Sequence, residues 1–137
     1  ASKNGGFTAG TPWLPFNTGC AHLNAAAERA DTDSVLNWYR SLIALRRDKE
    51  FAETIAEGDF VPLYESVPNV FVYMRRTERQ SIVIAANFGR EPAVLSGELP
   101  APALRVLLAS TDAAHIIENC GTALCLPSLA AAVVLLG

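Results

Sequence analysis

The sequence has 137 residues, of which 50% are hydrophobic and only 18% are charged, and its formal net charge is −3. This length fits one domain, or one domain with an attached remnant of another. Charged residues are scarcer than the quarter or so that is usual in soluble domains, so we expect a partner to cover part of the surface. Because the balance is acidic and no basic stripe is present, a nucleic-acid partner is not expected.

Membrane insertion and secretion are not expected either. No apolar run approaches the roughly 20 residues that a membrane-spanning helix needs, and the nearest, residues 129–136, has the length of a buried strand. No secretory signal is recognisable, and no initiator methionine is present. We therefore expect a piece of a longer, cytoplasmic protein.

The three cysteines, Cys20, Cys120 and Cys125, have no spacing typical of a disulfide framework, which favours a reducing compartment. His115 with Cys120 and Cys125 could be imagined around zinc, but a convincing fourth ligand is lacking. We expect no metal, no cofactor, and thiols that behave as small hydrophobic groups.

Residues 1–30 are expected to form a loop, because Gly and Pro recur too often for a long regular element. Phe7, Trp13, Leu14 and Phe16 are nevertheless large and apolar. Two interpretations stay open: these side chains pin the loop to a body, or they shape a cleft.

The spacing of apolar residues predicts a helix over residues 32–47. Thr32 or Asp33 is expected to cap its start, and Arg46 and Arg47 complement the helix dipole at its end. Apolar residues at positions 35, 36, 38, 39, 42, 43 and 45 span about half of the circumference, which is wider than the usual stripe. Because so wide a face requires partners on two sides, the isolated chain is expected to self-associate through this helix, or the helix is expected to rotate or fray and hide its face.

After Phe51 the pattern changes to short apolar runs separated by turn signals, which predicts a mainly β fold, an antiparallel β-sandwich. The expected strands are residues 60–64, 70–74, 82–86, 93–95, 104–108, 122–126 and 130–136. The runs VFVYM and SIVIAA are apolar on both faces, which is typical of central strands covered on two sides. Arg75, Arg76 and Arg79 are expected in a solvated hairpin tip beside Glu78.

No residue stands in a catalytic context. Each of the 14 acidic residues fits a helix end, a turn or a strand edge. Neither His22 nor His115 lies near a recognisable nucleophile, and phosphate-binding and metal-binding motifs are missing. The residues alone predict no self-sufficient chemistry.

Two segments carry a family resemblance: GFTAGTPWLPFN at residues 6–17 and DTDSVLNWYRSLIALRR at residues 31–47. They resemble the loop and the last helix that end the catalytic (β/α)8 barrel in α-glucosidases of the α-amylase superfamily, of the oligo-1,6-glucosidase type. Asn87-Phe88 and Leu126-Pro127 resemble strand ends of the β domain that follows in that family.

The resemblance implies that residues 1–50 are the end of a barrel, with a loop over 1–30, and that residues 51–137 are an antiparallel β domain capping it. The family's retaining mechanism uses an Asp nucleophile, a Glu acid/base and a second Asp, and none of the three maps onto this sequence. The expected catalytic set is therefore empty, and the chain alone is expected to be inert. Asn4, Phe7 and Trp13 are expected to line a substrate cleft, and the expected partner is the catalytic barrel.

Three alternatives stay open. The same scaffold serves sucrose isomerases and transglycosylases, and it also serves the non-catalytic heavy chains of amino-acid transporters, which need a membrane anchor. A carbohydrate-binding module is the third, and it would show exposed aromatic side chains. The chain's aromatic residues in or beside apolar runs are instead expected in the core: Phe60, Tyr64, Phe71, Tyr73 and Phe88.

Overall fold

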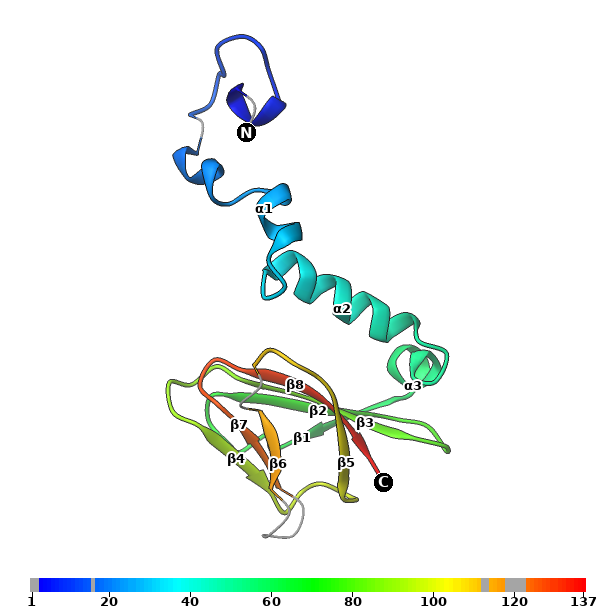
Figure 1. The fold of residues 1–137 in the computed structure, drawn as a ribbon. Helices are drawn as coiled ribbons and strands as arrows, with labels where there is room; N and C mark the ends of the chain where they lie inside the picture. Colours follow the sequence, from blue (N-terminus) through cyan, green and yellow to red (C-terminus); the bar gives the residue numbers. More distant parts are fainter. Residues whose placement is uncertain (1–2, 16, 112–113, 118–122) are drawn as a thin grey trace. The chain divides into compact units, whose positions relative to one another are not determined.

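The computed structural model describes residues 3–15, 17–111, 114–117 and 123–137. Its contacts divide the chain into two compact units, Ala1–Ser41 and Leu42–Gly137, and each is described by itself (Figure 1). The division falls inside helix α2 (Val35–Arg47). The domain boundary expected near residue 50 stays a prediction.

The N-terminal unit contains short helical elements where only a loop was expected. Two 3-10 turns, η1 (Lys3–Gly6) and η2 (Thr18–Ala21), precede helix α1 (Ala25–Ala30). The side chain of Asn24 caps α1 by accepting hydrogen bonds from the backbone N–H groups of Ala26 and Ala27. Prediction of a loop up to residue 30 was wrong here, because the glycines end at Gly19 and a capped run of alanines, the best helix formers, follows.

The start of α2 is capped by Ser34, not by Thr32 or Asp33. The Ser34 hydroxyl accepts from the N–H of Asn37 at 3.2 Å, and it donates to the backbone oxygen of Glu28 at 2.5 Å. The Asn37 amide donates to the same oxygen at 3.0 Å. These bonds lock the end of α1 to the start of α2, and they explain why the predicted helix begins three residues late.

The C-terminal unit is the antiparallel β-sandwich that the sequence predicted (Figure 1). Its five-stranded sheet has the order β1-β2-β3-β8-β5, and its three-stranded sheet has the order β4-β7-β6. The strands are β1 (Asp59–Leu63), β2 (Val70–Arg76), β3 (Ser81–Asn87), β4 (Ala93–Ser96), β5 (Ala103–Ala109), β6 (His115–Ile117), β7 (Ala123–Leu126) and β8 (Ala131–Leu136). Only β6 lay outside the predicted runs.

Side chains alternate across the five-stranded sheet, as the two-residue period of a strand requires. Val72 and Met74 of β2, with Val83 of β3, face the three-stranded sheet and meet Leu95 and Leu124 there. The intervening residues face the other way. The five-stranded sheet therefore supplies one wall of the sandwich core and keeps a second, outer face.

Helix α3 (Ala52–Glu57), which the sequence analysis missed, covers part of that outer face. Ile82 and Val133 form a second buried cluster there with Phe51, and Ile55 packs against it. This agrees with the predicted cover on both faces for the run SIVIAA at Ile82, but the prediction was wrong for the run VFVYM, because Phe71 on the outer face is 55% exposed.

Gly58 sets how closely α3 approaches the sheet. A methyl group at this position would lie 2.6 Å from the backbone oxygen of Thr54 and 2.9 Å from that of Arg76. Since these are backbone atoms, no side-chain movement could relieve the contact. Gly58 is therefore required where α3 turns into β1.

Asn87 joins the two sheets of the sandwich by hydrogen bonds. It is 3% exposed, and its amide donates to the backbone oxygens of Glu91 at 2.8 Å, Pro127 at 2.9 Å and Leu126 at 3.3 Å. Its side-chain oxygen accepts from the N–H of Gly89 at 2.8 Å. Every polar atom of this buried side chain has a partner.

We expect Asn87→Ala to lower the free energy of unfolding by about 2–3 kcal/mol, because it strands buried carbonyl groups, each costing about 1–3 kcal/mol. Urea unfolding of the chain measures the change. Asn87→Asp keeps the acceptor for Gly89 but places a carboxylate oxygen against the three carbonyl groups, so it should destabilise the fold at least as much as Asn87→Ala. Stability unchanged in both variants would contradict this role.

Candidate functional site

The loop expected to line a cleft is organised by Asn4. The Asn4 amide donates to the backbone oxygens of Thr8 at 3.1 Å and Gly10 at 2.9 Å. Asn4 adopts a left-handed backbone with φ of 54°, which asparagine tolerates better than most residues. The side-chain amide of Asn4 therefore holds the backbone of residues 4–10 in a closed loop.

Phe7 and Trp13 project from this loop. Phe7 is 93% exposed and Trp13 is 91% exposed, so neither packs within its own unit. Such exposure in two large aromatic side chains is typical of groups that meet a ligand or another surface. Their place in a substrate cleft stays a prediction.

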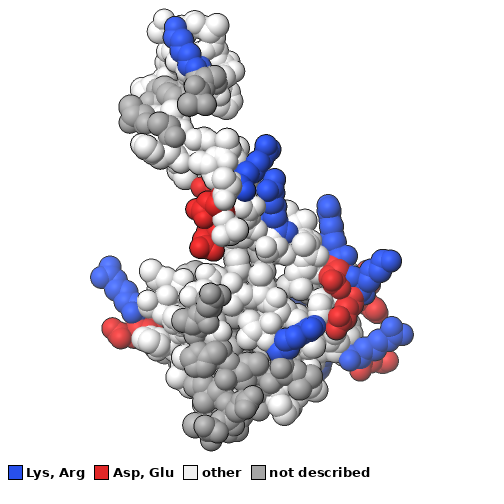
Figure 2. Space-filling model, viewed as in Figure 1, with Lys and Arg blue, Asp and Glu red and all other residues white. Residues whose placement is uncertain are grey.

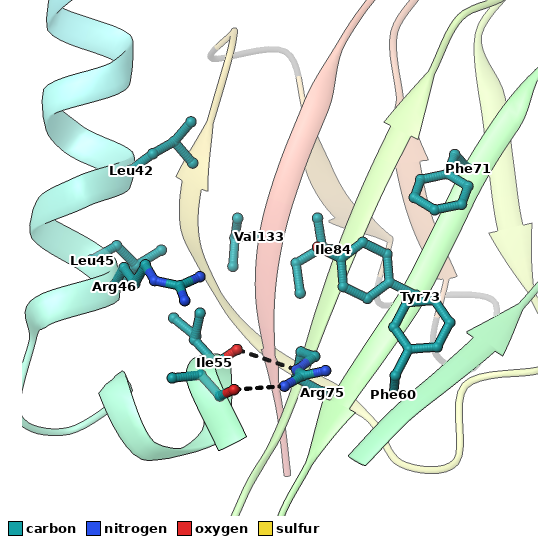
Figure 3. A pocket seen from close by; sticks show the side chains of 11 residues that line it. Leu42, Leu45, Arg46, Ile55, Phe60, Phe71, Tyr73, Arg75, Ile84 and Val133 are labelled. Atoms are coloured by element: carbon teal, nitrogen blue, oxygen red, sulfur yellow. Dashed lines mark hydrogen bonds between the residues drawn. The ribbon is translucent and has the colours of Figure 1, made fainter. Parts of the chain in front are cut away.

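A second feature, missed by the sequence analysis, is an apolar groove of about 570 Å³ in the C-terminal unit (Figure 3). It lies over the outer face of the five-stranded sheet, and side chains of α2, α3 and four strands surround it. The lining residues are Leu42, Leu45, Arg46, Ile55, Ala56, Phe60, Phe71, Tyr73, Arg75, Ile84 and Val133.

Arg75 fixes one wall of the groove by capping α3. Its guanidinium donates to the backbone oxygens of Ile55 at 3.2 Å and Ala56 at 2.9 Å (Figure 3). A cation there also complements the negative end of the helix dipole. The prediction of a solvated hairpin tip was wrong for Arg75, whereas Arg76 and Arg79 are exposed.

The groove carries positive charge without an acidic counterpart among its lining residues. Arg46 and Arg75 are the charged side chains of this set. Arg46 reaches into the groove from α2 (Figure 3). Acidic and basic side chains are interspersed on the face of the C-terminal unit seen in Figure 2, with uncharged areas between them.

The aromatic residues expected in the core divide into two groups. Tyr64 is buried, as predicted, and burial raises the pKa of its phenol. The prediction was wrong for Phe60, Phe71 and Phe88, which are 54%, 55% and 68% exposed. It was also wrong for Tyr73, which is half-buried and belongs to neither core cluster. Phe60 of β1 and Phe71 of β2 lie on the outer face of the five-stranded sheet and line the groove.

Phe60, Tyr73 and Phe71 form a ring cluster on that outer face. The ring centroids of Phe60 and Tyr73 are 5.0 Å apart in a stacked arrangement, and those of Phe71 and Tyr73 are 5.5 Å apart. The run VFVYM carried the signal for this cluster, because residues facing both ways were apolar.

The described residues supply no catalytic constellation. Acidic side chains found in contacts have structural partners: Glu28 accepts from the N–H of Leu36, Glu98 from that of Tyr64, and Glu50 pairs with Arg105 at 3.7 Å. Within the same residues, no His, Cys, Asp and Glu side chains gather in a group of three around a metal-sized space. Cys120 and the side chain of His115, weighed above as zinc ligands, lie outside them.

Across the described part of the chain, every helix is too short or too polar to cross a membrane.

Because the described residues show no catalytic group, the family of the chain is identified by comparison with known proteins. The family model described as the α-amylase catalytic domain matches residues 1–56. The probable oligo-1,6-glucosidase 2 of Bacillus subtilis is 43% identical over 94 residues, which are 69% of this chain and 16% of that protein. The trehalose-6-phosphate hydrolase of B. subtilis is 32% identical over 123 residues, covering 87% of this chain and 21% of the hydrolase. The chain thus spans about a fifth or less of these relatives' length.

Solved structures of a trehalulose synthase and an isomaltulose synthase share the fold. A trehalulose synthase from Pseudomonas mesoacidophila MX-45 superposes with a TM-score of 0.85 at 27% identity, over 99% of this chain and 24% of that one. An isomaltulose synthase from Klebsiella sp. LX3 gives 0.82 at 26% identity, over 96% and 23%.

We expect Asn4→Ala to loosen the loop, because it removes two hydrogen bonds of about 0.5–1.5 kcal/mol each and places alanine in a left-handed conformation. Amide hydrogen exchange should speed up at Phe7 and Gly10, measured by NMR. Asn4→Gly accepts the same backbone and lacks only the side chain, so it isolates the amide's contribution. Exchange rates that stay the same in both variants would show that the loop holds its shape without Asn4.

Proposed function

Because this chain belongs to the α-amylase superfamily of glycoside hydrolases and is of the oligo-1,6-glucosidase type, we propose that it forms the C-terminal part of a retaining α-glucosidase acting on α-linked gluco-oligosaccharides. The observation that carries the proposal is the 43% identity to the B. subtilis protein over 94 residues. The proposed partner is a catalytic barrel that supplies the acid/base and nucleophile, and the proposed location is the cytoplasm.

The two parts of the chain have different roles in this proposal. Residues 1–50 complete the barrel, and Asn4 holds its loop so that Phe7 and Trp13 line the substrate cleft. Residues 51–137 form a structural cap. Exposure of both aromatic side chains, and the rigid closure of the loop by one amide, support the first role.

Sucrose isomerisation or transglycosylation is the second candidate, favoured by the fold shared with the trehalulose synthase. This candidate is less well supported, because the chain is 27% identical to the trehalulose synthase and 43% identical to the probable oligo-1,6-glucosidase 2. The products formed from sucrose separate the two: an isomerase yields an isomeric disaccharide, and a hydrolase yields glucose and fructose.

A carbohydrate-binding module is favoured only by the exposure of Phe60 and Phe71. Sugar binding also requires polar groups arranged beside the rings, to meet the hydroxyls. Around these rings the groove offers mainly aliphatic side chains, and the Arg75 guanidinium is already bonded to α3. The surface therefore suits an apolar partner better than a sugar.

We expect a chimera, made of the B. subtilis relative up to its matched segment followed by this chain, to hydrolyse nitrophenyl α-glucoside and isomaltose. Its kcat/KM should lie within about tenfold of the relative's, a loss of at most about 1.4 kcal/mol in transition-state stabilisation. The relative truncated at the same point is the control, and this chain alone should show no turnover above a buffer blank. A folded but inactive chimera, or turnover by the purified chain, would contradict the proposal.

We also expect the isolated chain to self-associate through α2. Val35, Tyr39 and Ile43 recur every four residues along this helix, so they share one stripe, and all three are exposed. Tyr39→Ser with Ile43→Ser should lower the mass measured by light scattering at little cost in stability. Phe88→Ser, which removes a similarly exposed aromatic group that is not part of α2, should leave the mass unchanged. If the double variant stays associated, or unfolds the β domain, the stripe is not the contact.

A further inference from the structure

We propose that Asn4 is a deamidation site: Gly5 makes its side chain prone to ring closure, the folded loop delays the reaction, and the product cannot close the loop again. The chemistry requires only the chain itself and water. The inference goes beyond the proposed function, because it concerns a reaction of this polypeptide and holds for any protein that contains it.

The sequence around Asn4 favours the reaction. Asn4 is the only asparagine of the chain that is followed by glycine. Asparagine is among the thermally labile residues, because the backbone nitrogen of the next residue can attack its side-chain carbonyl carbon. Gly5 is exposed, and it has no Cβ to obstruct that approach. The dipeptide Asn4-Gly5 is therefore the position at which this reaction meets the least steric resistance.

The reaction proceeds in two steps. The Gly5 nitrogen forms a bond to Cγ of Asn4, and the Nδ2 group leaves with the proton of that nitrogen as ammonia. Water then opens the resulting five-membered succinimide at one of its two carbonyl carbons. One opening yields aspartate at position 4, and the other yields isoaspartate, in which the main chain runs through the former side chain.

The closed loop holds Asn4 away from the reactive geometry. Its Nδ2, the leaving group, donates to the backbone oxygens of Thr8 and Gly10. With φ of 54° and ψ of 31° at Asn4, the Gly5 nitrogen lies nearly opposite Cβ of Asn4 across the Cα–C bond, whereas ring closure requires the two on the same side. Because the backbone must rotate and both hydrogen bonds must break first, the rate follows local opening of the loop.

The product cannot restore the loop. An aspartate has no donor for the oxygens of Thr8 and Gly10, and it would place a negative charge against them, which is unfavourable. Isoaspartate in addition inserts the side-chain methylene into the main chain at the turn. Because ammonia is lost, the change is one-way, and it releases the segment that presents the exposed ring of Phe7.

Asn69 is a matched control within the same molecule. It is exposed, and its φ of 61° is close to that of Asn4. Val70 follows it, and its crowded, β-branched side chain hinders attack by its own backbone nitrogen. A difference in deamidation between positions 4 and 69 therefore reflects the following residue and not the left-handed backbone.

The test follows conversion of Asn4 by peptide mass spectrometry at mildly alkaline pH, at a chain concentration where light scattering shows a monomer. A synthetic peptide of residues 1–12 is the reference for the unfolded loop. We expect aspartate and isoaspartate to accumulate at position 4 and not at position 69. Conversion at position 4 should be about tenfold slower in the folded chain than in the peptide, the factor that two ordinary hydrogen bonds provide.

Variants of Thr8 test whether loop opening controls the rate. The Thr8 hydroxyl accepts from the N–H of Gly10 at 3.1 Å, so Thr8→Ala should weaken the loop and speed conversion of Asn4 severalfold. Thr8→Ser keeps the hydroxyl and should leave the rate unchanged. Asn4→Asp, which creates one of the two products directly, should speed amide hydrogen exchange at Phe7 and Gly10.

Three results would overturn the proposal: equal conversion at positions 4 and 69, conversion as fast in the folded chain as in the peptide, or unchanged hydrogen exchange at Phe7 and Gly10 after conversion. The chimera described above separates the proposal from the proposed function. If Phe7 lines the substrate cleft, glucosidase activity should fall as Asn4 is converted. Conversion that opens the loop and leaves this activity unchanged would support the modification site while it overturns the proposed role of Phe7.

Discussion

The C-terminal unit depends on one constraint: its five-stranded sheet is apolar on both faces, and both require cover. Alternation along β2, β3 and β8 sends every second side chain to each face. The inner face is covered by the three-stranded sheet, which creates the sandwich core around Met74 and Leu124. Among the described residues, no second sheet lies on the outer face. Its cover must come from helices and from whatever meets the bare strands.

Helix α3 is held on the sheet by a few specific backbone contacts and hydrogen bonds more than by the apolar surface area that it buries. Helix α3 has only six residues, too few to be stable by itself. Gly58 permits its close approach to the backbone of Arg76, and the Arg75 guanidinium binds its last carbonyl groups. Because β2 supplies both contacts, α3 stays near one end of the outer face, and Phe71 remains uncovered.

The sandwich could be predicted from sequence because its signals are local and repeated: short apolar runs with turn residues between them. The burial of individual aromatic residues could not. Tyr64 and Phe71 occur in similar apolar surroundings along the chain, yet one lies inside the sandwich and the other faces outward. A run that is apolar at every position predicts two apolar faces and does not reveal which one the chain itself covers.

Helix α3 and the candidate site also could not be predicted from local sequence patterns. Helix α3 was missed because its residues, AETIAE, form too short a stretch for periodicity to be recognised. Arg75 resembled its neighbours Arg76 and Arg79 in the sequence, and only the fold distinguishes it, by bringing the carbonyls of Ile55 and Ala56 to its guanidinium. Long-range pairing determines these roles.

The two units differ in how far along the chain their hydrogen bonds reach, and this difference bears on function. Asn4 bonds to residues four and six positions away, and Asn37 reaches back nine positions to Glu28. Asn87, by contrast, bonds to Pro127 forty positions away. The loop bearing Phe7 and the corner before α2 therefore take their shape from neighbouring residues alone. A segment organised in this way can keep its geometry on the proposed barrel, whereas the β domain maintains a separate core of its own.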